Sequence, residues 1–275
     1  MTNLHKIRAR IRSVNSTQQI TRTMKMIAVS KLRKTQTSLA GVRLFADKSQ
    51  AVLNALLAGD ANFEHPYLTP RRHVGRVCYV VFWGNRGLVR AEARPCSVIV
   101  CGRWGRDVLA GTNLPVRQIF SDLSDTPTMA EALEIAEELK NLYRTGEADE
   151  IHLVYQHFDS VLHQTPVHRQ LLPAAPEADA PAANNNYLFV PDAQTVLDNV
   201  LELYLNNTVY AVMLEARVGE HAARMTAMTA ATDSTAELIE DLNLEFNRAR
   251  QAAITTEISE IVGGSAALKK SDKSD

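Results

Sequence analysis

The sequence predicts an α/β fold with long helices: an antiparallel coiled coil of N- and C-terminal helices, plus a small Rossmann-like α/β domain between them. Three observations predict it. The stretches 1–57 and 192–268 contain no proline and repeat apolar residues at helical spacing. The stretch between them alternates short apolar runs with an amphipathic helix. The two terminal stretches also carry opposite charge, which favours their pairing.

The N-terminal helix, 1–57, follows a heptad repeat that would bury one seam in a coiled coil. Eleven of its sixteen a and d positions are apolar. The a positions are Leu4, Ile11, Gln18, Lys25, Leu32, Leu39, Ala46 and Leu53. The d positions are Ile7, Val14, Thr21, Ala28, Thr35, Val42, Ser49 and Leu56.

Three of the five polar positions of this seam, Gln18, Thr21 and Lys25, lie close together. Apolar residues lie there on a rotated stripe, formed by Ile20, Met24 and Ile27. We interpret the stripe either as a local shift of the buried face or as a place where a second partner takes over.

The predicted C-terminal helix, 192–268, contains no proline, and Gly219 is its only glycine before the pair Gly263-Gly264. Its apolar residues recur at Val209, Met213, Ala216, Ala223, Leu238, Leu242, Phe246, Ala249 and Ala253. Roughly 70 helical residues would span on the order of 100 Å, so the helix needs a partner along its side. Over 246–268 it is apolar around most of its circumference. We therefore expect this end to lie inside a sleeve made by other subunits.

The charges of the two helices are complementary. Residues 1–57 hold eleven lysines and arginines and one acidic residue, Asp47, whereas residues 192–275 hold seven basic and fourteen acidic residues. Each helix would repel its own copy and attract the other. The sequence therefore predicts an intramolecular pair and not a homo-oligomer.

The middle of the chain begins with a connector, 58–76, and continues into an α/β domain, 77–173. We expect a mostly parallel sheet, with strands at 77–83, 97–101, 116–120, 150–157 and 167–172. The segment 128–144 is predicted to be a helix, with Thr128 and Glu131 as a capping box. Its expected buried face consists of Ala132, Leu133, Ala136, Leu139, Leu142 and Tyr143.

A low-complexity linker, 174–191, follows this domain, and a polar tail, 269–275, is expected to be disordered. The chain has no run of eighteen apolar residues and no secretory signal. The three cysteines Cys78, Cys96 and Cys101 are expected to be buried thiols in a reducing compartment.

The motifs of common catalytic sites are missing from the sequence. There is no phosphate-binding loop, no G-x-S-x-G and no H-E-x-x-H, and the eight histidines show no metal-ligand spacing. We therefore expect no catalytic residue, cofactor or metal. The basic N-terminal helix could bind nucleic acid, but the acidic helix of the same chain complements it better, so no nucleic-acid partner is predicted.

Long motifs at both ends resemble one family. Residues 7–33 read I-R-x-R-I-x-S-V-x-S-T-Q-x-I-T-x-T-M-K-M-I-A-x-S-K-L-R. Residues 220–228 read E-H-A-A-R-M-x-A-M, with A-T-D at 231–233, and residues 246–264 read F-N-x-A-R-Q-A-x-I-T-x-E-I-x-E-I-V-G-G. The matching stretches and the helices that carry them make up about half the chain. The chain resembles the gamma subunits of F-type ATP synthases.

This resemblance implies a central rotor stalk that couples transmembrane ion flow to ATP synthesis or hydrolysis. The implied partners are a hexamer of alpha and beta subunits, the epsilon subunit and the membrane c-ring. The implied subunit is present once per complex, is peripheral at the cytoplasmic face of the bacterial cell membrane, and has no active site of its own.

The resemblance also implies interface residues. Candidate contacts to the beta subunits are Arg224, Arg250, Gln251, Thr255 and Glu257, and candidates for a coupling region on the first helix are Met24, Lys25 and Arg33. Ordinary solvation of a helix surface is the alternative interpretation of these side chains.

One loop departs from the family pattern. The loop after the first strand usually reads D-R-G-L-C-G, and here Asn85–Arg90 reads N-R-G-L-V-R, which suggests a divergent branch such as an alternative ion-pumping ATPase. No dithiol insertion of the chloroplast type is apparent, so we infer no thiol switch. Two other functions stay open: a coiled-coil tether or adaptor with an α/β interaction domain, and a nucleotide-binding enzyme, which the missing phosphate loop disfavours.

Overall fold

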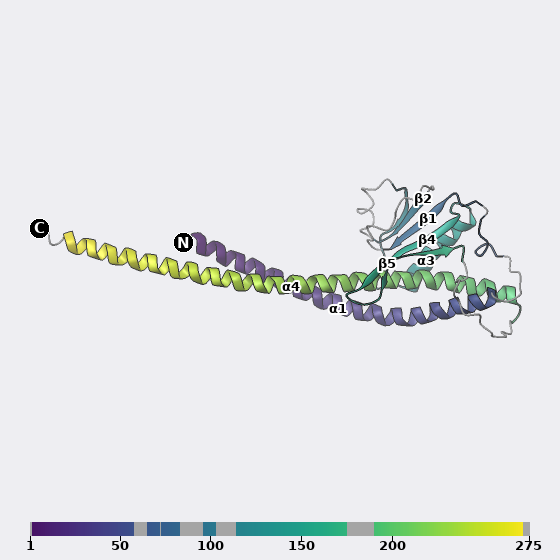
Figure 1. Ribbon diagram of the computed structural model, residues 1–275, viewed down its shortest axis with the longest axis horizontal. Coiled ribbons are helices and arrows are strands. Elements are labelled where there is room, and N and C mark those ends of the chain that lie inside the picture. Colours follow the sequence, from purple (N-terminus) through teal and green to yellow (C-terminus); the bar gives the residue numbers. More distant parts are fainter. Residues whose placement is uncertain are drawn as a thin grey trace. The chain divides into compact units, whose positions relative to one another are not determined.

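The fold was analysed in a computed structural model, which describes residues 2–57, 65–71, 73–82, 96–102, 114–174 and 190–271. Two long helices, α1 (Thr2–Leu57) and α4 (Ala193–Ser271), are the first and last elements along the chain, and all other elements lie between them in the sequence (Figure 1). The chain forms two compact units, one of residues 1–28 and 224–275 and one of residues 29–223. Each long helix contributes to both units.

The unit of residues 29–223 contains a five-stranded sheet in the order β3-β2-β1-β4-β5. The strands are β1 (Val77–Phe82), β2 (Cys96–Cys101), β3 (Val116–Phe120), β4 (Glu150–Phe158) and β5 (Gln164–Leu172). All neighbouring pairs are parallel except β4 and β5, which are antiparallel. The predicted α/β fold with a mostly parallel sheet is confirmed.

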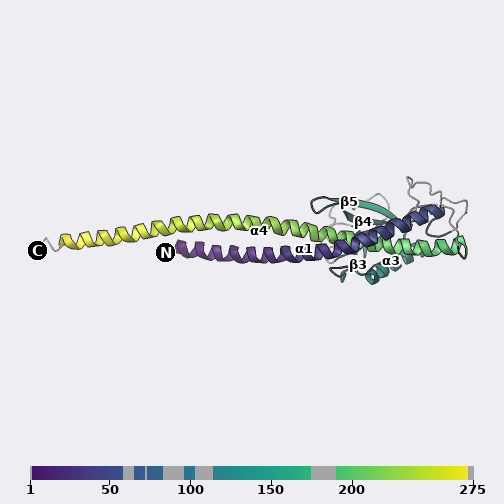
Figure 2. The same ribbon diagram turned by 90° about the horizontal axis from the view of Figure 1, so that it is seen from below.

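The two faces of this sheet belong to separate apolar clusters, because successive side chains of a strand point to opposite faces. In β1, Cys78, Val80 and Phe82 join the larger cluster, in which α3 (Met129–Arg144) and segments of α1 and α4 cover the sheet (Figures 1 and 2). The alternate residues of β1 join Val98 and Val100 on the other face. The larger cluster thus seats both long helices on one sheet face.

Helix α3 begins as the sequence predicts. Thr128 is its N-cap, and the capping box with Glu131 is present. Leu133 was expected to be buried but is 37% exposed, and Ile135 is fully buried in its place. The buried positions follow the i, i+3, i+4 spacing from Ala132, which leaves residue 133 about 100° away on the helix surface.

In the unit of residues 1–28 and 224–275, α1 and α4 form an antiparallel pair. The guanidinium of Arg8 lies 5.3 Å from the centre of the Phe246 ring. Further along, the Thr232 hydroxyl donates to the Thr21 hydroxyl over 3.0 Å. Residue 8 of α1 contacts residue 246 of α4, and residue 21 contacts residue 232, so the two helices run in opposite directions. The predicted antiparallel arrangement is confirmed.

The heptad seam of α1 is buried or half-buried at all sixteen a and d positions. This includes Thr21, which is 8% exposed, so the buried face does not shift where the repeat turns polar. The first interpretation of the rotated stripe is therefore wrong. The side chains of this stripe are exposed: Ile20 is 57%, Met24 41% and Ile27 49% exposed. That a second partner covers them stays a prediction.

The side chains of α4 are buried in one part of the helix and mostly exposed in another. Residues 211–219 are all buried, whereas Leu242 is the one fully buried residue among the described side chains of 224–263. Ala223 and Ala253 were expected on the apolar stripe but are exposed, and Leu238 is 37% exposed. The Arg8–Phe246 contact sets the register, so α1, which begins six residues before Arg8, ends opposite residue 252. Ala253 has no α1 residue opposite it.

Several predicted features lie outside the described residues. They are the loop Asn85–Arg90 with Trp83 before it, most of the linker 174–191, part of the connector 58–76, and the last four residues. Helix α4 runs to Ser271, so residues 269–271 of the expected disordered tail are helical. In the described ranges, no helix has the length and apolar character needed to cross a membrane.

Candidate partner interface

Four of the five candidate interface residues of α4 lie within about two helical turns. Arg250, Gln251, Thr255 and Glu257 are all exposed, and the Thr255 hydroxyl donates to the Gln251 carbonyl oxygen over 2.9 Å. At 100° per residue, Arg250 and Glu257 share a stripe with apolar neighbours, as do Gln251 and Thr255. The apolar residues of these two stripes are Ile254, Ile258, Ile261 and Val262, which are 48–66% exposed. The surface therefore combines specific polar groups with area that gains from burial.

The remaining candidates are spread over the two helices. Met24 is 41% exposed and belongs to the exposed stripe of α1, whereas Lys25 is half-buried at a seam position. Arg33 is exposed and belongs to the unit of residues 29–223. Arg224 is half-buried at the start of the other unit's α4 segment. The structure brings together the four residues 250–257 but does not gather all eight into one cluster.

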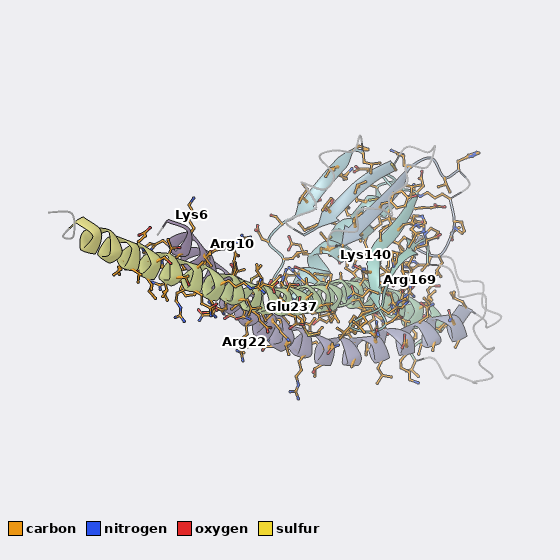
Figure 3. The ribbon with its side chains drawn as sticks, turned by 60° about the vertical axis from the view of Figure 1, so that its left-hand side comes forward. Lys6, Arg10, Arg22, Lys140, Arg169 and Glu237 are labelled. Carbon is orange, nitrogen blue, oxygen red and sulfur yellow. The ribbon has the colours of Figure 1, made fainter. Side chains whose placement is uncertain are left out.

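The charged residues that the two helices present are also exposed. Lys6, Arg10 and Arg22 are exposed on α1, and Glu237 is exposed on α4 (Figure 3). The basic charge of α1 and the acidic charge of α4 are therefore partly exposed on the protein surface. Such a surface can steer a charged partner to the helices.

Two polar junctions, which sequence reasoning missed, fasten α4 to α1 and to the α/β domain. The first surrounds Glu215, which is 6% exposed. Arg43 of α1 donates from Nε to Glu215 Oε1 over 2.8 Å, and His157 Nδ1 of β4 lies 2.8 Å from Glu215 Oε2. Arg43 also donates to the carbonyl oxygen of Phe158 over 3.0 Å. Burial and the nearby Glu215 carboxylate raise the pKa of Tyr155.

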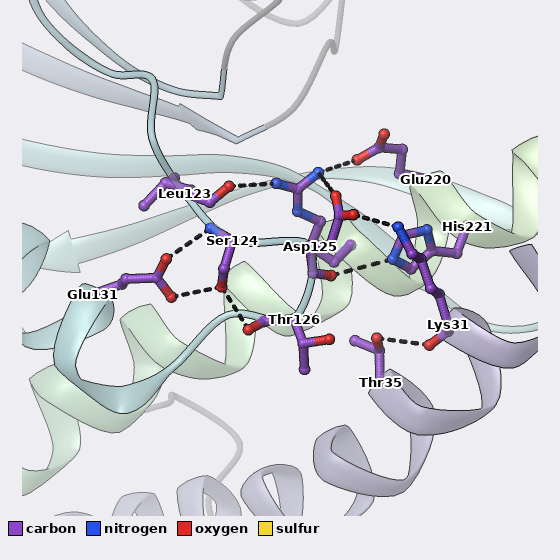
Figure 4. Close-up of polar contacts among 10 residues, drawn as sticks. Lys31, Thr35, Leu123, Ser124, Asp125, Thr126, Glu131, Glu220 and His221 are labelled. Atoms are coloured by element: carbon purple, nitrogen blue, oxygen red, sulfur yellow. Dashed lines mark hydrogen bonds and ion pairs between the residues drawn. The ribbon is translucent and has the colours of Figure 1, made fainter. Parts of the chain in front are cut away.

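The second junction surrounds Arg217, which is 7% exposed, and Asp125, in the loop between β3 and α3 (Figure 4). Arg217 donates to the Leu123 carbonyl oxygen over 3.0 Å and to Glu220 over 2.7 Å. Its Nη1 also lies 3.9 Å from Asp125 Oδ1. The arginine therefore ties α4 to two residues of this loop.

Asp125 extends this junction to α1 and to a second residue of α4. Lys31 of α1 donates to its carboxylate, and His221 Nε2 lies 3.2 Å from its carbonyl oxygen. The bond from Lys31 and the neighbouring cations lower the pKa of Asp125. Three elements thus meet at one carboxylate-bearing residue.

A third polar contact joins α3 to α4. Lys140, which is 4% exposed, contacts Glu137 on its own helix and Glu202 of α4 at 2.5 and 2.8 Å. Burial lowers the pKa of Lys140, but its two carboxylate partners raise it by more than burial lowers it. The pKa of Lys140 therefore lies above the ordinary lysine value. The ammonium therefore stays charged at this contact.

One sequence signal could have found the junctions around α4. The buried run 211–219, A-V-M-L-E-A-R-V-G, carries Glu215 and Arg217 among apolar residues. Charges in such a run are almost always paired. The sequence shows that partners must exist, but it does not name most of them, because all except Glu220 lie 58–172 residues away. Among the described residues, no group of three metal-ligating side chains occurs.

These features define a class of protein: two long antiparallel helices with an α/β domain between them in the sequence and exposed apolar side chains on both helices. Comparison with known proteins identifies the family. The ATP synthase family model matches residues 3–268. The chain is 41% identical to the ATP synthase gamma chain of Desulfitobacterium hafniense, covering 98% of this chain and 100% of that one. It is also 41% identical to the gamma chain of Heliobacterium modesticaldum, with the same coverage.

Solved structures share the fold. The rotor of the Euglena gracilis mitochondrial ATP synthase superposes with a TM-score of 0.61 at 16% identity, covering 92% of this chain and 99% of that one. A chain of the OSCP/F1/c-ring structure from the same organism gives 0.68 at 19% identity, covering 97% and 95%. The chain belongs to the ATP synthase gamma-chain family.

Proposed function

We propose that this chain is the central rotor stalk of an F-type ATP synthase. It couples ion flow across a membrane to ATP synthesis or hydrolysis by rotating inside a hexamer of alpha and beta subunits. The full-length relation to curated gamma chains, at 41% identity, carries this proposal. The chain contributes no active site of its own, and the nucleotide chemistry belongs to the hexamer.

The end of α4 supports the hexamer as the surrounding partner. Ile254, Ile258, Ile261 and Val262 are each about half or more exposed. Fully burying such a side chain is worth about 1.5–3 kcal/mol, so four of them strongly favour an apolar sleeve. The exposed stripe of α1 around Met24 supports a further contact with the same hexamer.

We further propose that Met24, Lys25, Arg33, Arg224, Arg250, Gln251, Thr255 and Glu257 are the residues that contact the hexamer. The α/β domain, for which we propose the boundaries 77–173, faces the epsilon subunit and the c-ring. The chain is present once per complex, since its two helices satisfy one another. It is peripheral, at the cytoplasmic face of a bacterial cell membrane.

Purification of a tagged chain from its native membranes tests the proposal. One chain per hexamer predicts that alpha and beta subunits, identified by mass, co-purify in molar excess over the tagged chain. Recovery of the chain without these subunits would overturn the proposal and favour a coiled-coil tether or adaptor. A matched preparation with an untagged chain controls for subunits that bind the resin.

A further inference from the structure

We propose that Asp125 is a positioning residue that makes the Lys31–Asp125–Arg217 junction a torque-bearing joint between the helix pair and the α/β domain. The joint serves the rotary coupling of the proposed function and rests on it. Within the α/β domain, the loop between β3 and α3 is the segment that contacts α1 and α4 in this junction.

The first argument is the place of the junction in the chain. The division between the two compact units falls after Ala28 in α1 and after Ala223 in α4. Lys31 lies three residues inside the first division, and His221 lies two residues inside the second. Both helices therefore leave the α/β-bearing unit within one helical turn of this junction. Twisting of either helix reaches the domain here first.

The second argument is the number of elements involved. Lys31 comes from α1, Asp125 from the β3–α3 loop, and Arg217 and His221 from α4. The carboxylate of Asp125 faces both Lys31 and Arg217, while its backbone carbonyl faces His221. The Thr35 hydroxyl donates to the Lys31 carbonyl oxygen over 2.9 Å, and Thr35 is fully buried. Asp125 is the point through which all three elements are linked.

The loop that carries Asp125 is itself held firmly. Ser124 donates from its backbone nitrogen to Glu131 Oε1 over 2.7 Å and from its hydroxyl to the Thr126 carbonyl oxygen over 2.6 Å (Figure 4). The same Glu131 caps α3 through Thr128. A load on Asp125 therefore passes into α3 and the sheet instead of bending a loose loop.

The third argument is the kind of force that the contact resists. Apolar burial is non-directional and depends on area, so it does not by itself fix one rotational setting of a helix. Charge-assisted hydrogen bonds require a set direction and are roughly twice as strong as neutral ones. Residues 211–219 of α4 are buried, and directional contacts add to the close packing that resists rotation of this helix about its own axis. The junction supplies such contacts at the end of the unit.

The test uses the assembled complex, fixed to a surface through its hexamer. A bead is attached to the α/β domain through a biotin-tagged cysteine in place of Leu162, which is 87% exposed in the turn between β4 and β5. With ATP present, bead rotation reports function. With nucleotide turnover stopped, the angular fluctuation of the bead reports torsional stiffness.

We expect Asp125→Asn to raise the mean-square angular fluctuation, because the charge-assisted contact with Lys31 becomes a weaker neutral one. Lys31→Gln should act in the same direction, and Asp125→Glu should restore the stiffness of the parent chain. The matched control is Asp122→Asn, the same change at an exposed residue three positions earlier in the same loop. Assembly and ATP hydrolysis at low load should stay the same in all four variants.

The outcomes of this experiment distinguish a failure of the proposed joint from a failure of the proposed function. A parent complex that does not rotate with ATP overturns the proposed function and the joint with it. If the parent complex rotates and the Asp125→Asn and Lys31→Gln variants are as stiff as Asp122→Asn, the joint alone is overturned. A loss of stiffness that Asp125→Glu does not restore also overturns it, because the role would then not depend on the carboxylate.

Discussion

Arg43 and Glu215 are 172 residues apart in the sequence, yet their side chains meet at 2.8 Å between α1 and α4. Glu215 is buried, and its second oxygen lies 2.8 Å from His157 of β4. The pair joins both long helices to the sheet at one carboxylate. The stability of the α/β-bearing unit should therefore depend on this contact.

Replacement of Arg43 by methionine should destabilise this unit. Removing one partner of a buried ion pair is destabilising, and since Arg43 is partly exposed and His157 still contacts Glu215, we expect a loss of about 2 kcal/mol. Denaturant unfolding of the purified chain measures it. Lys34→Met, at an exposed position of the same helix, is the control and should change the free energy of unfolding little. Equal effects of the two variants would contradict the prediction.

Glu131→Gln should weaken the start of α3 in a pH-dependent way. Burial raises the pKa of Glu131, but the hydrogen bonds from Ser124 and Thr128 lower it more, so its pKa in the folded chain lies below the ordinary value. The charged form then contributes stability above the unfolded pKa of about 4.3, and this contribution is lost as the pH falls through the folded pKa.

At neutral pH, we expect Glu131→Gln to cost about 1 kcal/mol, as is typical of a lost capping contact. The difference from the parent chain should shrink as the unfolding experiment is repeated at lower pH. Glu134→Gln, on the exposed side of the same helix, provides the reference. A cost that stays constant down to pH 3 would show that the charge of Glu131 is not involved.

Simultaneous replacement of Arg250 and Gln251 by alanine should impair coupled turnover of the assembled complex. Both side chains are exposed at the end of α4, where no α1 residue lies opposite residues past 252. They are thus available to a surrounding partner. Ion pumping driven by ATP in vesicles measures the effect. The double variant Asn247→Ala with Arg248→Ala removes the same chemistry from exposed positions nearby, and unchanged pumping in both variants would remove Arg250 and Gln251 from the mechanism.

Replacement of Ile254 and Ile258 by glutamine should have opposite effects on the free chain and on the complex. The free chain should become more soluble, because two half-exposed apolar side chains are lost. Association with the hexamer should weaken by roughly tenfold or more, since each buried isoleucine is worth about 1.5–3 kcal/mol. Solubility and binding are measured on the same preparations, with Thr256→Gln as the control. Unaltered binding would mean that these side chains face solvent in the complex.

Local patterns in the sequence were enough to predict much of the fold. The heptad of α1 identifies every seam position, including Thr21, and the strand at 116–120 agrees with β3 residue for residue. The capping box of Thr128 and Glu131 is also local. Such features depend on residues within about one helical turn or one strand of each other, so they can be read directly.

Other features required the whole fold. Leu133 is exposed and Ile135 is buried, because the position of α3 on the sheet decides which arc of the helix is covered. The rotated stripe of α1 is not part of the buried face, because α4 packs along the heptad seam without a shift. The eight candidate interface residues came from family resemblance, since no local pattern in the sequence distinguishes them from other residues of the two helices.

The two long helices, their opposite charge, the α/β domain between them and the family can all be inferred from the amino-acid sequence. Which charges meet depends on the folded packing, which pairs Arg43 with Glu215, and Lys31 and Arg217 with Asp125. Helical and strand periodicities are set by neighbouring residues, so they are visible in one dimension. The partner of a buried charge is set by how separate elements pack, and that packing exists only once the chain has folded.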